Sequence, residues 1–422
     1  MSDYNVIVVG GGPAGMAAAI EARKTEGARV LILERNTALG GILPQCIHNG
    51  FGSVIFEADL PGPEYALRYR DQVEKLGIDV LLDTMVMDIT PDREVYAMNS
   101  HDGYLHFRPE SIVLAMGCRE RTRSQIQLPG VRCTGIFTAG TVQRLVNIEG
   151  YMPGKRVVVL GSGDIGMIMA RRLTIEGAEV VGVFELLPFL TGLRRNYVQC
   201  LLDYNIPLHL STTVTNIFGS RRLEAVEVAR VDEKLSPISG TSQRIECDTL
   251  LLSVGLIPEN ELSRSAGVEL DSRTAGPLVD NFMATNVPGI FAAGNVVMIY
   301  DLVDYVSKAG VVAGSSAGRY SRTGEWKTGE CVTLAAGENV GVLLPQKIRL
   351  DGAGEKELLL KLRSSSLLER RVTVEVRDEK GPVVSFREQY ARPAEMIIHP
   401  LKPKEIQAIK GAASRQLTVT IQ

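Results

Sequence analysis

The sequence is poor in the features that identify disulfide-rich, zinc-binding or membrane-spanning proteins. Its 422 residues include one tryptophan and six cysteines, and the cysteines lie far apart, with no Cys-x-x-Cys pair and no Cys/His zinc spacing. Widely spaced thiols in a long chain are typical of reduced intracellular proteins. No apolar run reaches the roughly 18 residues that a membrane-spanning helix needs. We therefore expect a cytoplasmic protein without membrane insertion and without a metal site.

The chain also lacks a strong charge of either sign. Its formal net charge is −3, with 46 lysines and arginines against 49 aspartates and glutamates, so nothing favours a nucleic acid as partner. The length suits two or three ordinary globular domains. What the chain has in excess is glycine, with 42 residues, against a usual share of about 7%. Such an excess indicates tight turns or close approach of the backbone to another molecule.

The first glycine cluster follows a short apolar segment near the N-terminus. Residues 5–9 (NVIVV) predict a strand that is buried on both faces. The sequence GGGPAG follows, then an alanine-rich helix, then a second buried strand that ends at Glu34. Strand, G-x-G-x-x-G, helix, strand and terminal acid together form the dinucleotide-binding fingerprint.

Each part of this fingerprint has a mechanical role. Gly10 allows the tight turn, Gly12 lets the backbone reach a pyrophosphate, and Gly15 lets helix and strand pack closely. The start of the helix supplies unpaired N–H groups and a positive dipole end for the phosphates. Glu34 can accept hydrogen bonds from an adenosine ribose.

The same pattern recurs about 150 residues later. Residues 156–160 (RVVVL) lead into GSGDIG, whose glycines are Gly161, Gly163 and Gly166, and the following strand ends at Glu185. The methionines of the helix between them are expected to pack in the core. An acid at the end of the second strand favours an unphosphorylated ribose, and hence NAD over NADP. The alternative is a unit that folds without binding a nucleotide.

Further motifs follow each fingerprint in a fixed order. They are Leu39-Gly40-Gly41, residues 111–117 (SIVLAMG), residues 248–255 (DTLLLSVG), residues 286–295 (NVPGIFAAGN) and the small-residue helix 305–320. Together with the two fingerprints, this series resembles the two-dinucleotide-binding-domain flavoproteins, the group that contains glutathione and thioredoxin reductases. In that group the first unit binds FAD, and the second, inserted into the first, binds NAD(P).

The resemblance implies an α/β fold with two Rossmann-like domains. We expect an FAD domain from residues 1–122 and 250–325, an NAD(P)-type domain from 123–249, and a small β-sandwich-like domain from 326–422. The implied cofactors are FAD and NAD(H). The expected contacts are Gly10, Gly12, Pro13, Ala14, Gly15, Glu34, Arg35, Gly40, Gly41, Ile42, Val86, Gly117, Gly161, Gly163, Asp164, Ile165, Gly166, Glu185, Gly294 and Asn295.

Two positions depart from the pattern of that group. Asn295 stands where the late motif ends in an acid that holds the ribityl chain, and an asparagine can still hydrogen-bond a hydroxyl there. Ile168 stands where the second unit often carries a glutamate. The helix 305–320 is expected to point its N-terminus at the flavin and so stabilise negative charge on the reduced ring.

The loop after the glycine pair differs from that of the disulfide reductases. They carry two cysteines there, whereas residues 42–51 (ILPQCIHNGF) contain Cys46 alone, so a dithiol relay is not expected. Three roles remain open for this loop. Cys46 could be a single redox thiol, His48 could carry a proton at the flavin, or the loop could be a structural cover.

A narrower resemblance comes from residues 40–52 and 137–173. These runs are similar to flavoprotein subunits of multi-subunit dehydrogenases, which act on proline, opines or glycine-derived cyanide or accompany a glycerol-3-phosphate dehydrogenase. It implies a small-molecule substrate and a partner dehydrogenase subunit or a homo-oligomer. The expected function is an FAD-dependent oxidoreductase that passes electrons between NAD(H) and a small molecule or partner. The alternatives are an FAD-holding assembly or electron-relay subunit, and a single-cysteine peroxide or disulfide reductase.

The last 97 residues change in character from helical patterning to alternation. Segments such as RVTVEVR and QLTVTIQ predict strands, and residues 378–381 (DEKG) predict a hairpin turn. We expect a small antiparallel sandwich or barrel. His399 lacks the glutamate partner that follows the catalytic histidine of disulfide reductases, so we expect it to be structural.

Overall fold

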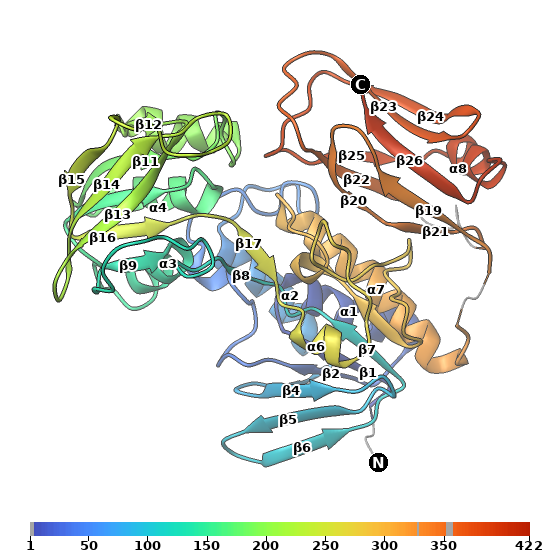
Figure 1. Cartoon of the computed structure of the whole chain (residues 1–422). Coiled ribbons are helices and arrows are strands. Elements are labelled where there is room, and N and C mark those ends of the chain that lie inside the picture. Colours follow the sequence, from blue (N-terminus) through green and yellow to red (C-terminus); the bar gives the residue numbers. More distant parts are fainter. Residues whose placement is uncertain (1–3, 327–328, 352–357) are drawn as a thin grey trace. The chain divides into compact units, whose positions relative to one another are not determined.

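The chain folds into two compact units, each built on a parallel sheet. The computed structural model describes residues 4–326, 329–351 and 358–422. Contacts divide the chain into one unit formed by Met1–Cys118 and Pro258–Gln422 and a second formed by Arg119–Ile257. Where the chain passes between them, β8 (Cys118–Glu120) pairs with β17 (Leu256–Pro258) (Figure 1). The expected α/β class with two Rossmann-like sheets is confirmed.

The domain boundaries inferred from the sequence stay predictions. The contact division keeps the C-terminal domain within the first unit, so it does not test a boundary between residues 325 and 326. Of the predicted domains, residues 1–3, 327–328 and 352–357 lie outside the described residues.

A five-stranded parallel sheet, in the order β18-β7-β1-β2-β3, organises the first unit. Every residue of its three central strands is buried, as apolar runs such as VIVV predict for strands covered on both faces. The strands are β1 (Val6–Val9), β2 (Val30–Leu33), β3 (Asp79–Leu81), β7 (Ser111–Leu114) and β18 (Ile290–Ala292).

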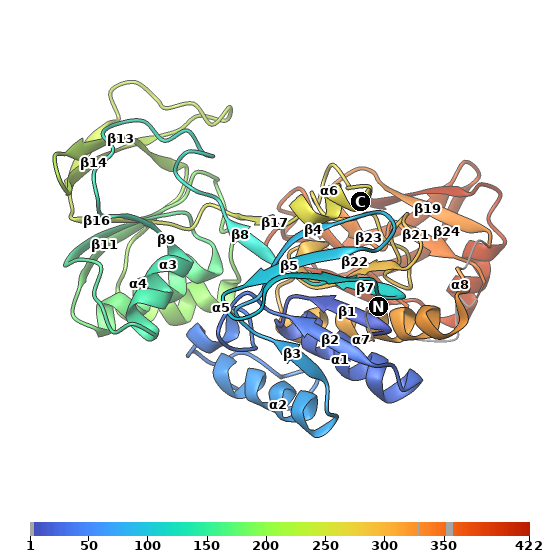
Figure 2. The same cartoon turned by 90° about the horizontal axis from the view of Figure 1, so that it is seen from below.

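Helices cover one face of this sheet and an antiparallel meander covers the other, as Figures 1 and 2 show from two directions. Buried side chains of the meander belong to the same hydrophobic core as the strands and helices. The helices on the first face are α1 (Pro13–Glu26), α2 (Gly62–Lys75) and α7 (Val303–Thr323), whereas the short α6 (Glu261–Ser265) contacts β4 of the meander. The meander strands are β4 (Met85–Ile89), β5 (Val95–Asn99) and β6 (Gly103–Phe107).

Helices α1 and α7 lie side by side with almost no side chain between them. Gly310, Gly314 and Gly318 recur every four residues along α7 and so share one face of it. A Cβ on Gly310 would lie 2.2 Å from the carbonyl oxygen of Ala14, and a Cβ on Gly314 would lie 2.1 Å from that of Ala18. Glycine is therefore required on α7 by the closeness of the α1 backbone.

The second unit repeats the strand–helix–strand pattern around a sheet of order β12-β11-β10-β16-β9. The methionines of its fingerprint helix, Met167 and Met169, are fully buried, as predicted for core packing. A three-stranded antiparallel sheet, β13-β14-β15, completes the unit. The elements are β9 (Ile136–Thr138), α3 (Ala139–Asn147), β10 (Arg156–Leu160), α4 (Asp164–Ile175), β11 (Glu179–Phe184), α5 (Arg194–Asn196), β12 (Leu208–His209), β13 (Thr212–Gly219), β14 (Leu223–Arg230), β15 (Gln243–Glu246) and β16 (Thr249–Leu252).

The C-terminal domain, orange to red in Figure 1, is β-rich as expected. A five-stranded and a three-stranded sheet share one hydrophobic core, and the predicted turn at residues 378–381 joins β23 to β24. The elements are β19 (Cys331–Ala336), β20 (Val340–Leu344), β21 (Lys347–Arg349), β22 (Leu359–Ser364), β23 (Val372–Asp378), β24 (Gly381–Glu388), β25 (Ile397–Pro400), α8 (Pro403–Lys410) and β26 (Gln416–Ile421).

The expectation of a purely antiparallel C-terminal domain is wrong for one strand pair. Strands β19 and β26, the first and last of the domain, run parallel, with Thr333 opposite Gln416. Alternation along a strand reports which face is buried and says nothing about the direction of a neighbour. A pairing between the two ends of a domain is therefore invisible to the local pattern.

The α1–α7 contact gives a testable prediction for the fold. The substitution Gly314→Ala places a methyl group against a backbone oxygen that cannot move aside, so we expect a loss of about 3 kcal/mol in unfolding free energy. Gly411→Ala in the C-terminal domain is the matched control, because its added Cβ has only ordinary contacts at 3.5 Å. Urea denaturation of the two variants checks this. Equal midpoints would contradict a tight helix contact.

Candidate functional site

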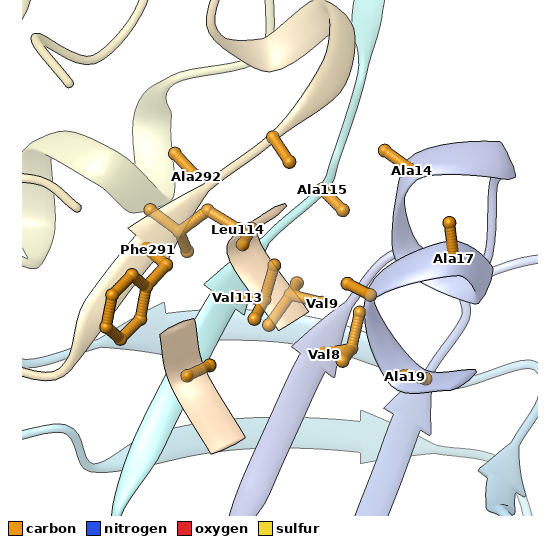
Figure 3. Close-up of a cluster of buried hydrophobic side chains, with 14 of the residues drawn as sticks. Val8, Val9, Ala14, Ala17, Ala19, Val113, Leu114, Ala115, Phe291 and Ala292 are labelled. Atoms are coloured by element: carbon orange, nitrogen blue, oxygen red, sulfur yellow. The ribbon is translucent and has the colours of Figure 1, made fainter. Parts of the chain in front are cut away.

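The chain leaves β1 through the first glycine cluster, at the carboxyl edge of the first sheet. Gly10 has φ of +104°, and a Cβ there would lie 2.5 Å from the carbonyl oxygen of Ala115, just beyond β7. A Cβ on Gly15 would lie 1.9 Å from the carbonyl oxygen of Gly10. Figure 3 shows the buried side chains of β1, β7 and β18 at this edge, with Ala14 and Ala115 labelled. Protein packing by itself therefore requires glycine at positions 10 and 15.

Gly12 is different, because neither its conformation nor its neighbours require a glycine. Its backbone is extended, with φ of −74° and ψ of −175°. The nearest atom to an added Cβ is the Cα of Gly41, at 3.9 Å. The open space at Gly12, directly before the first turn of α1 with Pro13 and Ala14, fits a ligand that approaches the backbone at a helix N-terminus.

The carboxylate of Glu34 is buried and held rigidly at the end of β2, with 4% of the residue exposed. Its Oε2 accepts a hydrogen bond from the N–H of Gly11 at 2.6 Å, and its Oε1 accepts two from Asn36 at 2.8 and 2.9 Å. Arg35, by contrast, is exposed. The acid of the fingerprint thus lies beside the glycine loop, where an adenosine ribose is expected.

The glycine pair at 40–41 packs against the same loop. The N–H of Gly40 donates to the carbonyl oxygen of Gly11 at 2.9 Å, and a Cβ on Gly41 would lie 3.1 Å from the Cα of Gly12. Both glycines have positive φ, +123° and +58°. The next side chain, Ile42, is 53% exposed. The pair therefore borders the open space at the start of α1 and presents an apolar side chain beside it.

Three further predicted residues reach this edge from the later crossover segments. Gly117, shortly after β7, has φ of +74° and no atom within 4 Å of an added Cβ. A Cβ on Gly294 would lie 2.7 Å from the Cβ of Ala14. The Nδ2 of Asn295 donates a hydrogen bond to Cys118 Sγ at 3.7 Å, and its Oδ1 accepts one from the N–H of Tyr300 at 3.1 Å. The structure thus brings the first fingerprint, the first crossover and the late motif together.

Val86 is placed differently from these residues. It lies in β4 of the meander, opposite Ala97, and its side chain belongs to the hydrophobic core with 5% of the residue exposed. A cofactor could therefore contact only the backbone of Val86. Its contact with a cofactor stays a prediction, as do those of the other site residues.

The second fingerprint repeats the geometry of the first. Gly161 has φ of +95°, with an added Cβ 2.1 Å from the carbonyl oxygen of Ser253, and a Cβ on Gly166 would lie 2.5 Å from Ser253 Cβ. Gly163 again has an ordinary conformation, and its nearest neighbour is the rotatable Oγ of Ser253 at 2.9 Å. Backbone packing thus requires glycine at the two outer positions, whereas at the position expected to face a pyrophosphate only the Ser253 hydroxyl, which accepts the Gly166 N–H at 3.1 Å, would have to move.

Glu185 holds the same buried position in the second unit as Glu34 does in the first. It is 4% exposed, and its Oε2 accepts hydrogen bonds from the N–H of Ser162 at 2.8 Å and from its hydroxyl at 2.6 Å. Its Oε1 accepts the N–H of Leu187 at 2.9 Å. A buried carboxylate at this place adds negative charge where a 2′-phosphate would have to lie.

The loop that follows Glu185 also packs on the second fingerprint, although its residues were not among the predicted contacts. Gly192 comes seven residues after Glu185, as Gly41 does after Glu34, and a Cβ on it would lie 2.8 Å from the backbone nitrogen of Asp164. Asp164 accepts a hydrogen bond from the Leu193 N–H at 2.8 Å. The equal spacing from acid to glycine in both units was the available signal. Ile165, the next residue of α4, is half-buried.

The loop carrying Cys46 and His48 is ordered by local contacts. Cys46 is 8% exposed, and its thiol donates to the carbonyl oxygen of Ile42 at 3.4 Å. All six cysteines lie in the described ranges, and none of them forms a disulfide. The ring of His48 lies 5.0 Å from that of Phe51 and is half-buried, with Nδ1 2.9 Å from the Asn49 carbonyl oxygen. The histidine is thus more accessible than the cysteine.

A cavity of about 470 Å³ lies between the start of α7 and the C-terminal domain. Its walls come from residues 301–305 and 388–398 and mix carboxylates with apolar side chains. Arg363 of the C-terminal domain forms an ion pair with Asp301, which holds this part of the wall. The C-terminal domain therefore helps to shape the surroundings of the α7 N-terminus.

Three other expectations can be compared with the described residues. No cluster of three or more metal-ligating side chains occurs among them, and none of their helices is long and apolar enough to cross a membrane. The statement that His399 lacks a glutamate partner is wrong: its Nε2 lies 3.2 Å from the carboxylate of Glu405, and its ring stacks on Phe386 at 3.8 Å. Glu405 is six residues after His399, in the first turn of α8.

The contrast between Gly12 and Gly10 gives a prediction. With the flavin stripped from both proteins, Gly12→Ala should melt within about 2 °C of the parent. It should nevertheless retain little of the flavin that the sequence resemblance implies, because only a ligand needs the space. Gly10→Ala should lose folded protein, since its Cβ meets a backbone oxygen. Thermal melting and the ratio of flavin to protein absorbance check this. Full flavin content in Gly12→Ala would contradict the site.

Comparison with known proteins identifies the family. A family model described as pyridine nucleotide-disulphide oxidoreductase matches residues 4–317. Hydrogen cyanide synthase subunit HcnB of Pseudomonas protegens is 27% identical over 321 residues, which are 69% of this chain and 66% of that protein. An opine oxidase subunit of Agrobacterium tumefaciens is 26% identical over 311 residues, 69% of this chain and 61% of that protein. The match therefore spans less than two thirds of either relative.

Among solved structures, thioredoxin reductase of T. acidophilum has the same fold. It aligns with a TM-score of 0.62 and 24% identity, covering 76% of this chain and 100% of that one. The resemblance to two-dinucleotide-binding-domain flavoproteins is thereby confirmed. Since the family model spans about three quarters of the sequence, the chain belongs to the pyridine nucleotide-disulphide oxidoreductase family, whose cofactors are FAD and NAD(P)H.

Proposed function

We propose that this protein passes electrons between NAD(H) and a small-molecule substrate or a partner dehydrogenase subunit. The observation that carries the proposal is the shared geometry of the two fingerprints. In each, packing requires the outer glycines, whereas an added Cβ would meet no atom within 3.8 Å at Gly12 and only the side-chain hydroxyl of Ser253 at less than 3.4 Å at Gly163. Two such sites in one chain suit two dinucleotides, one in each unit.

The residues of the first unit suit FAD. Gly12 and the first N–H groups of α1 would receive the pyrophosphate, and the carboxylate of Glu34 would receive the ribose hydroxyls. Gly41 and Gly117 leave backbone free where the flavin half would pass, and the side-chain amide of Asn295 would bond the ribityl chain. When bound, FAD supplies the hydride acceptor and donor, and the protein supplies orientation.

The second unit suits NAD(H) better than NADP(H). Glu185 is buried and places its charge beside the expected ribose site. A 2′-phosphate there would meet like charge, which is unfavourable by several kcal/mol at low dielectric. Arg194 and Arg195 are exposed at α5, well past the end of the strand that carries the acid.

Within the loop after the glycine pair, we assign proton transfer to His48 and a packing role to Cys46. Cys46 is buried and its thiol already donates to a backbone carbonyl, whereas His48 is partly accessible and held against Phe51. Histidine is suited to exchange a proton near neutral pH. A single-thiol peroxide or disulfide reductase is the alternative, and it requires Cys46 instead.

The relatives named above favour a partner subunit, because both are named as subunits. An assembly or relay subunit would hold FAD and show no turnover of its own. Such a protein would become active only when the partner is added. The cavity beside α7 and the exposed Ile42 would then face the partner or its substrate.

The nucleotide preference is tested by anaerobic reduction of the purified protein. We expect NADH to bleach the flavin absorbance at least about tenfold faster than NADPH at equal concentration, a difference of roughly 1.4 kcal/mol. Stopped-flow absorbance measures both rates. Bleaching by neither nucleotide would contradict the NAD(H) link, and equal rates would contradict the role of Glu185.

The loop assignment is tested by the pair Cys46→Ser and His48→Gln. After NADH reduction, His48→Gln should slow reoxidation by a soluble quinone, which needs protons, by about 100-fold. It should leave reoxidation by ferricyanide, which needs none, within about threefold. Cys46→Ser should leave both rates within about threefold. Loss of turnover in Cys46→Ser with FAD still bound would favour the single-thiol reductase.

A further inference from the structure

A buried carboxylate lies in the first turn of α7. Asp304 is completely buried, and its Oδ1 accepts the N–H of Ile55 at 2.9 Å while its Oδ2 accepts the N–H of Gly52 at 3.1 Å. Among the described residues, no lysine, arginine or histidine forms an ion pair with it. Its charge is compensated by these two backbone N–H groups and by the positive end of the helix.

An isolated buried carboxylate is expensive, so its presence calls for a structural reason. A neutral side chain at this position could also accept hydrogen bonds from the loop, but charged acceptors form hydrogen bonds roughly twice as strong as neutral ones. Both bonds run to one loop that is about 250 residues away in the sequence. The carboxylate therefore ties this loop to α7.

The loop held by Asp304 continues from the Cys46–His48 segment. At its base, the N–H of Gly62 donates to the carbonyl oxygen of Cys46 at 2.8 Å, and Phe51 forms a bridge with Leu60. Near its tip, the ring of Phe56 packs on α2 (Tyr65, 5.3 Å). These contacts fix the loop to α2 and to itself, and Asp304 adds the link to α7.

We propose that Asp304 is a positioning residue that fixes the loop of residues 46–61 against the N-terminus of α7 and so keeps His48 in place. The placement beside the flavin rests on the proposed function, whereas the fixing of the loop does not. Asp304 also offsets part of the positive charge that the α7 N-terminus was expected to offer the flavin. The helix end then acts on the loop as well as on the cofactor.

The test uses the reactivity of Cys46 in the FAD-loaded protein. Asp304→Asn keeps the size of the side chain, but asparagine has only one oxygen. Its NH2 group would therefore face one of the two loop N–H groups, donor against donor, and the loop should loosen. We expect iodoacetamide to alkylate Cys46 at least tenfold faster than in the parent, as measured by peptide mass spectrometry. Cys200 is the internal reference, because it is buried in the second unit and burial raises the pKa of its thiol.

Tyr65→Phe is the matched control variant. It removes another buried hydrogen bond to α7, the one between the hydroxyl groups of Tyr65 and Ser307 at 2.8 Å, without touching the loop backbone. We expect the alkylation rate of Cys46 in this variant to stay within twofold of the parent. Equal rates in Asp304→Asn and the parent, or equal acceleration in both variants, would overturn the proposal.

A second variant covers the case in which Asp304→Asn does not fold. Ile55→Pro removes one donor from the loop side and leaves the carboxylate in place, so Cys46 should again react at least tenfold faster. In either folded variant, quinone reoxidation should slow relative to ferricyanide reoxidation, as for His48→Gln. If the parent is not reduced by NADH but the alkylation contrast persists, the proposed function fails and the positioning role of Asp304 stands.

Discussion

The close approach of α1 and α7 is the contact on which the site depends. Glycines on α7 let its backbone reach the carbonyl oxygens of α1, at positions where any Cβ would lie about 2 Å away. Because α1 begins at the first fingerprint and Asp304 lies in the first turn of α7, one contact sets the distance between the first glycine loop and the N-terminus of α7. The late motif also packs closely on α1, since a Cβ on Gly294 would lie 2.7 Å from the Cβ of Ala14.

The two units share the same arrangement of acid and glycine loop but differ in the segment that follows it. Each has an acid that accepts hydrogen bonds from the glycine loop and a glycine seven residues later that packs back on it. In the first unit the loop beyond that glycine continues into Cys46 and His48. In the second it passes into α5, where Asp164 fastens it. Under the proposed function, the same fold would hold two dinucleotides and place reactive side chains beside only one of them.

Local patterns predicted the elements better than their partners. The strands, the fingerprint helices and the hairpin at residues 378–381 follow from periodicity and turn chemistry, which act over a few residues. The parallel pairing of β19 with β26 and the bonds from Asp304 to the loop join residues far apart in the sequence, and no local pattern reports them. The spacing from Glu185 to Gly192 could have been found by comparing the two units directly.

The central claim is that the glycines of the first unit make room for FAD and those of the second for a different nucleotide. The most direct measurement is the amount and identity of the cofactor released by heating the purified protein, separated from adenine nucleotides by chromatography. The proposed arrangement predicts one FAD per chain and no second flavin. A protein that folds without flavin, or that releases two FAD per chain, would contradict it.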